Sequence, residues 1–181
     1  MSDRFLYTLP TDPVAVPLVE QLTDEYHTRY GDYFEKGGAS QEMNRYPPER
    51  FSAPDGAFVL LLRGERPIAG GAFMRYDEHT AELKRMWTDR DHRRQGLARR
   101  VLAELEAQAL RQNYRKVYLT TGFRQPEARE LYLRAGYSPL FDLDAEPETV
   151  QILAFEKRLL PVGALFANEN GDAPRSAAAG K

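Results

Sequence analysis

The chain has little of what most metal and redox sites need: it contains no cysteine and only three histidines among 181 residues. The absence of cysteine excludes disulfides, zinc–thiolate sites and cysteine nucleophiles together. The histidines His27, His79 and His92 do not have the spacing of metal ligands, so we expect no metal site. The longest apolar run, at 57–62, is far shorter than a membrane span and indicates a buried strand. We therefore expect no membrane partner.

An excess of charge of one sign is also lacking, since 25 basic and 27 acidic side chains give a net charge of −2. Such a balance argues against a protein that coats nucleic acid or an acidic membrane. The first residues include Asp3 and are not followed by an apolar segment, so we expect no signal peptide. Together with the missing cysteines, this favours a cytoplasmic location.

The hydrophobic pattern predicts one domain over 1–161 and a disordered tail over 162–181 that is rich in Gly, Ala, Asn and Ser. The expected strands lie at 4–9, 57–63, 67–76, 80–88, 117–121, 137–141 and 150–157. The expected helices lie at 13–30, 96–112 and 125–135, with a further short helix at 40–45. This order predicts an α/β fold of the α+β type: a central mixed, mostly antiparallel twisted sheet of six to seven strands, flanked by about four helices.

The turn before the helix at 96–112 has the composition of an anion site. The first turn of a helix exposes unpaired N–H groups and a partial positive charge. Gly96 and Ala98 are small enough for a phosphate to approach the backbone, and Arg93, Arg94 and Arg99 add positive charge. The alternative is a solvated, arginine-rich helix start. The turn is neither a P-loop nor a dinucleotide-binding fingerprint, because neither glycine pattern is present.

Two motifs resemble signatures of the GNAT superfamily of N-acetyltransferases. Arg93-x-x-Gly96-x-Ala98 is similar to the Gln/Arg-x-x-Gly-x-Gly/Ala turn that holds the pyrophosphate of coenzyme A in that family. It follows the Ala-Glu-Leu strand at 81–83, as in the family. The later segment Gln125-x-x-Ala128-x-x-Leu131-Tyr132-x-x-x-Gly136-Tyr137 resembles the family's Asn-x-x-Ala-x-x-Leu-Tyr-x-x-x-Gly-Phe.

The resemblance covers about 57–160, and the chain departs from the pattern at two positions. Gln125 stands where Asn is usual, and Tyr137 stands where Phe is usual. The resemblance implies the GNAT fold, acetyl-CoA as cosubstrate, and transfer to a primary amine by direct attack in a ternary complex. It also allows a homodimer. The acceptor amine and the range of acyl groups stay open.

The resemblance further implies which residues hold the cosubstrate. The backbone at 86–88 would pair with the pantetheine arm like an added strand, with the Met86 N–H as the oxyanion donor. The residues expected at the cosubstrate are Met86, Trp87, Thr88, Arg93, Arg94, Gln95, Gly96, Leu97, Ala98, Arg99, Gln125 and Ala128.

Two side chains are candidates for proton transfer. Glu82, on the strand that leads into the turn, would act as general base, directly or through water. The alternative is a carboxylate that faces solvent or only pairs with Lys84 or Arg85. Tyr132 would act as general acid toward the coenzyme A sulfur. Its alternative, packing on one face of the helix at 125–135, is compatible with that role.

The acceptor is expected to bind near the first helix and the loop at 32–55. Tyr30, Tyr33, Phe34 and Glu35 combine aromatic rings with a carboxylate that would suit a cationic amine, or they form an ordinary loop. Two other classes remain as alternatives. One is a non-catalytic sensor or scaffold of the same fold that binds acyl-CoA. The other is nucleic-acid binding through the arginines at 90–100, which we rank last, so that no nucleic-acid partner is expected.

Overall fold

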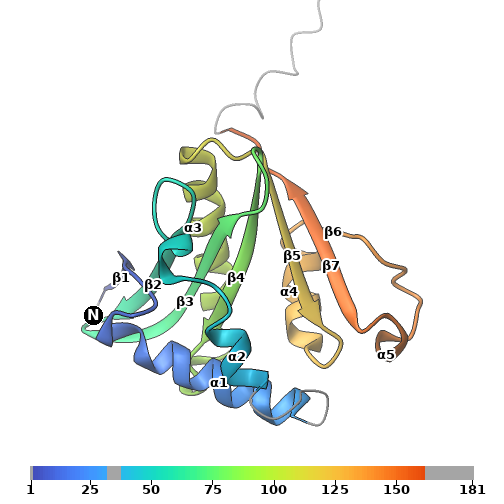
Figure 1. Cartoon of the computed structure of the whole chain (residues 1–181), viewed down its shortest axis with the longest axis horizontal. Helices are drawn as coiled ribbons and strands as arrows, with labels where there is room; N and C mark the ends of the chain where they lie inside the picture. The colour runs from blue at the N-terminus through green and yellow to red at the C-terminus, as the bar shows by residue number, and fades with distance from the viewer. Residues whose placement is uncertain (1, 32–37, 162–181) are drawn as a thin grey trace, which may run out of the picture.

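The computed structural model describes residues 2–31 and 38–161, which form a seven-stranded sheet in the order β1-β2-β3-β4-β5-β7-β6 (Figure 1). All neighbouring strands are antiparallel except β4 and β5, which are parallel. The predicted mixed, mostly antiparallel sheet is therefore confirmed. Its strands are β1 (Asp3–Tyr7), β2 (Ala57–Arg63), β3 (Arg66–Arg75), β4 (Thr80–Thr88), β5 (Lys116–Gly122), β6 (Ser138–Pro139) and β7 (Ile152–Arg158).

Five α-helices and three short 3₁₀ helices flank the sheet in the described ranges, one α-helix more than expected. The added α5 occupies part of the segment between β6 and β7. The strand expected at 137–141 is shorter in the structure and covers only Ser138–Pro139, although the Leu140 N–H still donates to the Ala154 carbonyl at 2.8 Å. The helices are η1 (Pro13–Ala15), α1 (Val16–Tyr30), α2 (Gly38–Met43), η2 (Pro48–Phe51), η3 (Arg90–His92), α3 (Leu97–Arg111), α4 (Pro126–Arg134) and α5 (Pro147–Val150).

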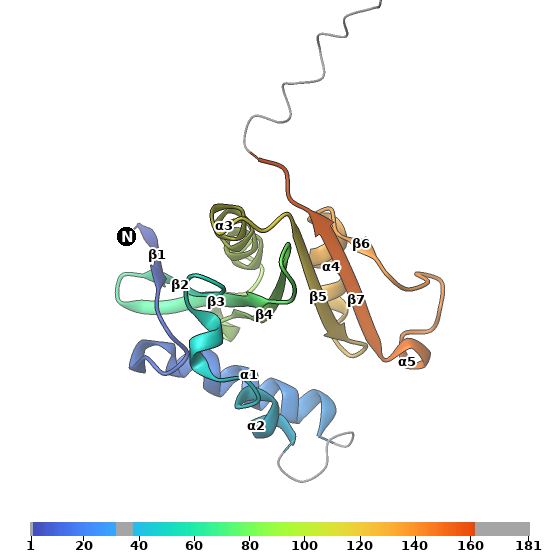
Figure 2. The same ribbon diagram turned by 45° about the horizontal axis from the view of Figure 1, so that its top comes forward.

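The sheet separates two apolar cores, because side chains alternate between its faces. Val59 and Leu61 of β2 join the core under α3 and α4. Leu60 and Leu62 of the same strand join the core under α1 and η2. Figure 2 shows α3 and α4 on one side of the sheet, with α1 and α2 on the other. None of the helices in the described ranges is long and apolar enough to cross a membrane.

The sheet opens between β4 and β5. The two strands pair only over the three residues from Thr80 to Glu82, opposite Lys116 to Tyr118. Beyond these pairs β4 continues to Thr88, and the two strands diverge like the arms of a V (Figure 1). The backbone edge of β4 after Glu82 is therefore not covered by β5.

A β-bulge in β4 sets which side chains face each side of this opening. Arg85 has a positive φ of 60°, and the register with β3 shifts opposite it. As a result Lys84 and Arg85 both lie on the side of α2. Met86 lies on the other side, that of α3. Its sulfur packs so closely on Gly71 that a Cβ added to this glycine would be 2.6 Å from the sulfur.

The end of α1 is fastened to the end of β5 across the opening. Arg29 donates from Nη1 to the carbonyl of Arg124 at 2.8 Å, and Arg124 donates from Nη1 to the carbonyl of Arg29 at 2.6 Å. The Tyr30 hydroxyl accepts from the Arg124 N–H at 3.1 Å. It lies so close to Gly122 that a Cβ there would be 2.1 Å away. These contacts hold α1 beside the site described next.

Candidate active site

A cleft of about 660 Å³ lies where β4 and β5 diverge, between the end of β4, the start of α3 and one face of α4. Eleven of the twelve residues predicted to hold a cosubstrate line it, and so does Tyr132. The lining residues are Glu25, Met86, Trp87, Thr88, Arg93, Arg94, Gly96, Leu97, Ala98, Arg99, Gln125, Glu127, Ala128, Glu130, Leu131, Tyr132, Arg134 and Ala135.

The first turn of α3 opens into this cleft without a cap. Gly96 is the N-cap residue with φ 72° and ψ 15°, a left-handed conformation that favours glycine. No side chain caps the helix, and a Cβ built on Gly96 would meet nothing within 4 Å. The first N–H groups of α3 therefore face open space, as an anion-binding helix terminus requires.

Asp89 fixes the turn that precedes α3, and sequence reasoning did not identify it. Its side chain is 2% exposed and accepts hydrogen bonds from the Asp91 N–H at 3.0 Å and from Gln21 Nε2 at 3.0 Å. His92 Nδ1 lies 2.9 Å from the same carboxylate. Burial alone would raise the pKa of Asp89, but the hydrogen bonds from His92, Gln21 and Asp91 outweigh burial and lower the pKa to about 2. The carboxylate thus stays charged and joins the turn to α1.

The arginines around the turn differ in their ion pairs. Arg90, Arg93 and Arg100 pair with carboxylates of α1 or β1 at distances of 3.6, 3.6 and 2.6 Å respectively. Arg94 and Arg99 line the cleft and have no acidic partner within 4 Å in the described part of the chain. Two guanidinium groups are therefore open to an anion. The ion pairs of the other three weaken the nucleic-acid alternative.

Tyr132 packs on its neighbours and also reaches the cleft. Its ring makes a T-shaped contact with Tyr137 at 5.5 Å and a tilted contact with Phe155 at 5.7 Å, and the residue is 5% exposed. Within the described ranges its hydroxyl has no hydrogen-bond partner. Burial, and to a smaller extent Tyr26, raises the pKa of Tyr132. The phenol, which is protonated at neutral pH even without this shift, therefore stays protonated over a wider pH range.

Gln125 supports the opposite wall of the cleft. Its Oε1 accepts hydrogen bonds from Thr121 Oγ1 at 2.6 Å and from the Gly122 N–H at 3.4 Å. The residue that replaces the family's usual Asn thus ties the end of β5 to the start of α4.

Two predicted residues lie outside the cleft lining. Gln95 accepts a hydrogen bond from Arg63 Nη1 at 3.2 Å, which places its side chain toward β2. Glu82 lies on the α2 side of β4 and forms an ion pair with Lys84 Nζ at 3.1 Å. The pairing considered as the alternative for Glu82 is therefore present, and its catalytic role stays a prediction.

A second cavity of about 400 Å³ lies on the other side of the opening. Its walls include Tyr26 and Tyr30 of α1, Glu42 of α2 and the end of β5, and it shares Gln125 with the first cleft. Three of the residues expected at the acceptor, at 33–35, lie outside the described residues. Within the ranges that the structure describes, no group of three or more His, Asp or Glu side chains is arranged to hold a metal ion.

Comparison with known proteins identifies the family of the chain. The family model described as "Acetyltransferase (GNAT) family" matches residues 19–137, and the chain belongs to that family. A curated relative, the uncharacterized N-acetyltransferase YsnE of Bacillus subtilis, is 29% identical over 107 residues, which cover 56% of this chain and 71% of the relative.

Solved structures show the same fold. An acetyltransferase of the GNAT family from Staphylococcus aureus MU50 matches with a TM-score of 0.69 at 15% identity, over 88% of this chain and 100% of its own. PaiA N-acetyltransferase from Thermoplasma acidophilum, solved in complex with coenzyme A, matches with a TM-score of 0.65 at 15% identity, over 87% of this chain and 99% of its own. Family and fold together indicate an acyl-CoA N-acyltransferase.

Proposed function

We propose that the chain transfers the acetyl group of acetyl-CoA to a primary amine by direct attack within a ternary complex. The observation that carries the proposal is the uncapped N-terminus of α3 beside two unpaired arginines, at the point where β4 loses its partner strand. Acetyl-CoA, when bound, supplies an activated thioester. The residues of the cleft fit its diphosphate, because Gly96 leaves room for it and Arg94 and Arg99 supply matching charge.

The open edge of β4 would hold the pantetheine arm. The backbone at 86–88 lines the cleft and is not paired with β5, so its polar groups are available to an extended ligand. In this arrangement the Met86 N–H stabilises the negative charge that develops on the carbonyl oxygen.

Tyr132 and Glu82 would carry the protons. The Tyr132 hydroxyl donates its proton to the leaving sulfur, and burial, which raises its pKa, keeps the phenol protonated until the sulfur leaves. Glu82 accepts the amine's proton through water, since its carboxylate lies on the acceptor side of β4 and outside the cosubstrate cleft. Its ion pair with Lys84 is also the observation that favours the alternative function, an acyl-CoA-binding sensor or scaffold without turnover.

Release of free thiol from acetyl-CoA in the presence of an amine panel tests the proposal. The panel should hold amino acids, polyamines, aryl-alkylamines and peptides. Release that depends on an amine, with a mass increase of one acetyl group on that amine, supports catalysis. Saturable binding of acetyl-CoA with no release for any member would favour the sensor instead.

A further inference from the structure

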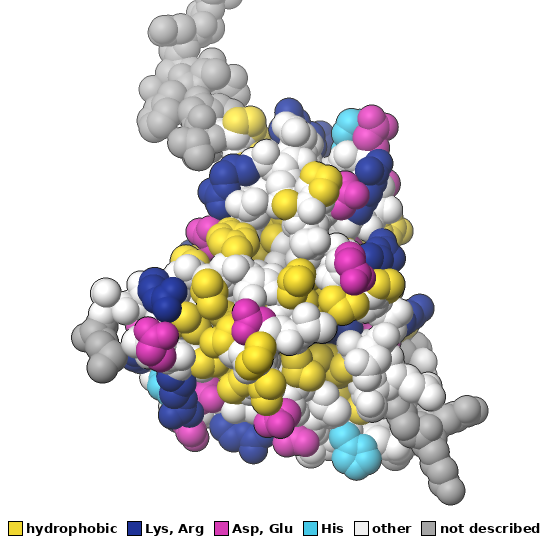
Figure 3. Space-filling view, turned by 60° about the vertical axis from the view of Figure 1, so that its left-hand side comes forward, with side chains coloured by type: hydrophobic (Ala, Val, Ile, Leu, Met, Phe, Trp, Pro, Cys, Tyr) yellow, Lys and Arg dark blue, Asp and Glu magenta, His cyan; other side chains and the backbone are white. Residues whose placement is uncertain are grey.

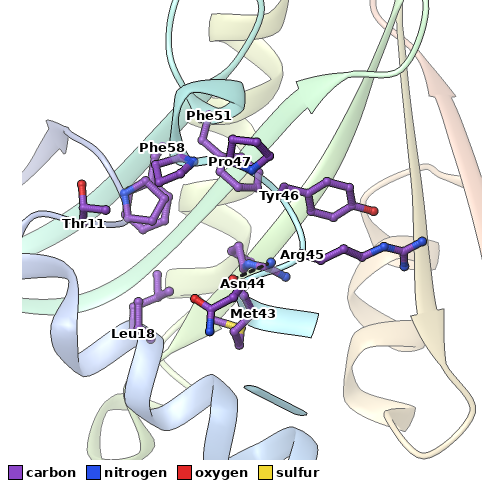
Figure 4. A pocket seen from close by; sticks show the side chains of 13 residues that line it. Thr11, Leu18, Met43, Asn44, Arg45, Tyr46, Pro47, Phe51 and Phe58 are labelled. Atoms are coloured by element: carbon purple, nitrogen blue, oxygen red, sulfur yellow. Dashed lines mark hydrogen bonds between the residues drawn. The ribbon is translucent and has the colours of Figure 1, made fainter. Parts of the chain in front are cut away.

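A third cavity, of about 330 Å³, lies on the α2 side of β4 and is not part of the cosubstrate cleft (Figure 4). Its volume is at the small end of the range of about 300–1,000 Å³ that is typical of small-molecule sites. Most of its lining is apolar or aromatic, and Arg85 is the buried cation among the lining residues. The lining residues are Pro10, Thr11, Leu18, Val19, Met43, Asn44, Arg45, Tyr46, Pro47, Pro48, Phe51, Phe58 and Arg85.

One face of the molecule also carries a gathering of apolar side chains. Figure 3 brings forward the side of the molecule on which β1 lies in Figure 1, and hydrophobic side chains gather in the middle of that face. Charged side chains surround them.

Arg85 is buried without a compensating carboxylate. It is 6% exposed, and its Nη2 donates to the main-chain carbonyls of Glu42 at 2.9 Å and Met43 at 3.3 Å. Its guanidinium also lies over the ring of Phe51, 5.8 Å from the ring centre. Within the described residues Nε and Nη1 have no hydrogen-bond partner, and no acidic group lies within 4 Å. Neither nitrogen is completely buried, so both are open to an anion that enters the cavity.

The surroundings of Arg85 add to this positive charge. Three cations lie over the ring of Tyr46. Two of them form ion pairs, Arg45 with Glu42 and Lys84 with Glu82. The third cation and Arg85 lack an acidic partner, which leaves an excess of positive charge at the cavity. The three cations lie 5.1–5.6 Å from the ring centre and are Arg45, Arg50 and Lys84.

The cavity is next to the proposed transfer point. Arg85 and Met86 are consecutive in β4, and their side chains lie on opposite faces of the sheet. Met86 lines the cosubstrate cleft, whereas Arg85 lines this cavity. We propose that the acceptor is an amine that also carries a carboxylate and an apolar group, as apolar α-amino acids do. The carboxylate binds Arg85, and the apolar group enters the cavity. This inference rests on the proposed function and replaces the cationic acceptor expected from the loop sequence.

Direct binding tests the cavity without relying on catalysis. Calorimetry would compare N-acetyl-L-phenylalanine, a product-like carboxylate, with N-acetylphenethylamine, which lacks the carboxylate. We expect the wild type to bind the first about tenfold more tightly or better, as a charge-assisted hydrogen bond implies. Arg85→Gln should remove this preference. Arg50→Gln deletes an equal charge that lies near the cavity but outside its lining, so it should lower the preference far less.

A second variant covers the case in which Arg85→Gln does not fold. Asn44→Trp would fill the cavity and leave Arg85 in place, and it should weaken binding of N-acetyl-L-phenylalanine about tenfold or more. Equal binding of the two probes to the wild type, no binding of either, or unchanged binding in both cavity variants would each overturn the inference.

The transfer reaction separates this inference from the proposed function. Thiol release from acetyl-CoA would be measured with L-phenylalanine and with phenethylamine. Faster release with phenylalanine, with a KM that rises in Arg85→Gln while kcat stays close to wild type, supports both. Equal or faster release with phenethylamine would keep the proposed function and refute the carboxylate-bearing acceptor. No release with any amine would refute the function itself.

Discussion

At the scale of single residues, the account depends on side chains whose surroundings fix their protonation. Tyr132 keeps its proton because burial raises its pKa. Asp89 loses its proton because three hydrogen bonds favour the carboxylate over the effect of burial. In the proposed mechanism the first supplies a proton to the leaving sulfur, and the second holds the turn before α3.

Tyr132→Phe tests the proton donor. The ring contacts are kept and only the hydroxyl is lost, so acetyl-CoA affinity should stay within about twofold while kcat falls by about 10²-fold, as loss of a general acid implies. In the wild type, the raised pKa keeps Tyr132 protonated between pH 6 and about 9. Over this range the rate should therefore not fall because of Tyr132 deprotonation. If the kcat of Tyr132→Phe equals that of the wild type over this pH range, Tyr132 is not the general acid.

Asp89→Asn tests the turn anchor. The pKa of Asp89 in the folded chain, about 2, lies below the ordinary value of 3.8 for an aspartate. The charged carboxylate therefore stabilises the fold above pH 4, and this stabilisation is lost as the pH falls from about 4 through 2. The stabilisation corresponds to about 2 kcal/mol. Urea unfolding should show that the variant is less stable at pH 7, and that the difference from wild type shrinks toward pH 2. A constant difference would contradict the linkage.

At the scale of elements, two junctions define the cleft: the start of α3 and the contact of α1 with β5. The first provides N–H groups to an anion, and the second keeps α1 beside the opening between β4 and β5. Both rely on a glycine, for different reasons. Gly96 adopts a left-handed φ and leaves open space in front of the helix. Gly122, which has no Cβ, leaves room for the Tyr30 hydroxyl.

Gly96→Glu should abolish binding of acetyl-CoA, since a carboxylate would occupy the diphosphate site. Gly136→Glu is a matched control. Gly136 also has a positive φ, of 86°, and it follows the C-terminal end of α4, outside the cleft lining. The control carries similar backbone strain and the same added charge, so it should keep cosubstrate affinity. Equal loss of binding in both variants would point to unfolding rather than to the site.

Gly122→Ala should destabilise the fold by about 1–3 kcal/mol, because its methyl group would overlap the Tyr30 hydroxyl. We expect the end of α1 to move, and hydrogen exchange should therefore rise in the last turn of α1 more than in α3. An unchanged unfolding midpoint would show that the contact between α1 and β5 is not as tight as described.

At the scale of the whole molecule, the sequence predicted the order of strands and helices well because hydrophobic periodicity is local. The grouping of the proposed cosubstrate residues around one cleft was predictable for the same reason, because they lie in or next to two short segments that resemble the family signatures. Asp89 was not predictable, because its partner Gln21 is 68 positions away in the chain. The cavity at Arg85 depends on a bulge, and nothing in the local sequence fixes the position of a bulge. Gln95 was included by its place in the motif, yet its side chain faces β2.

The most direct test of the account is calorimetric titration of the full chain with acetyl-CoA, with ATP as the control ligand. The account predicts saturable binding of one acetyl-CoA per chain and much weaker binding of ATP, because the edge of β4 adds contacts that ATP cannot make. Absence of acetyl-CoA binding, or equal binding of ATP, would contradict the assignment of the cleft.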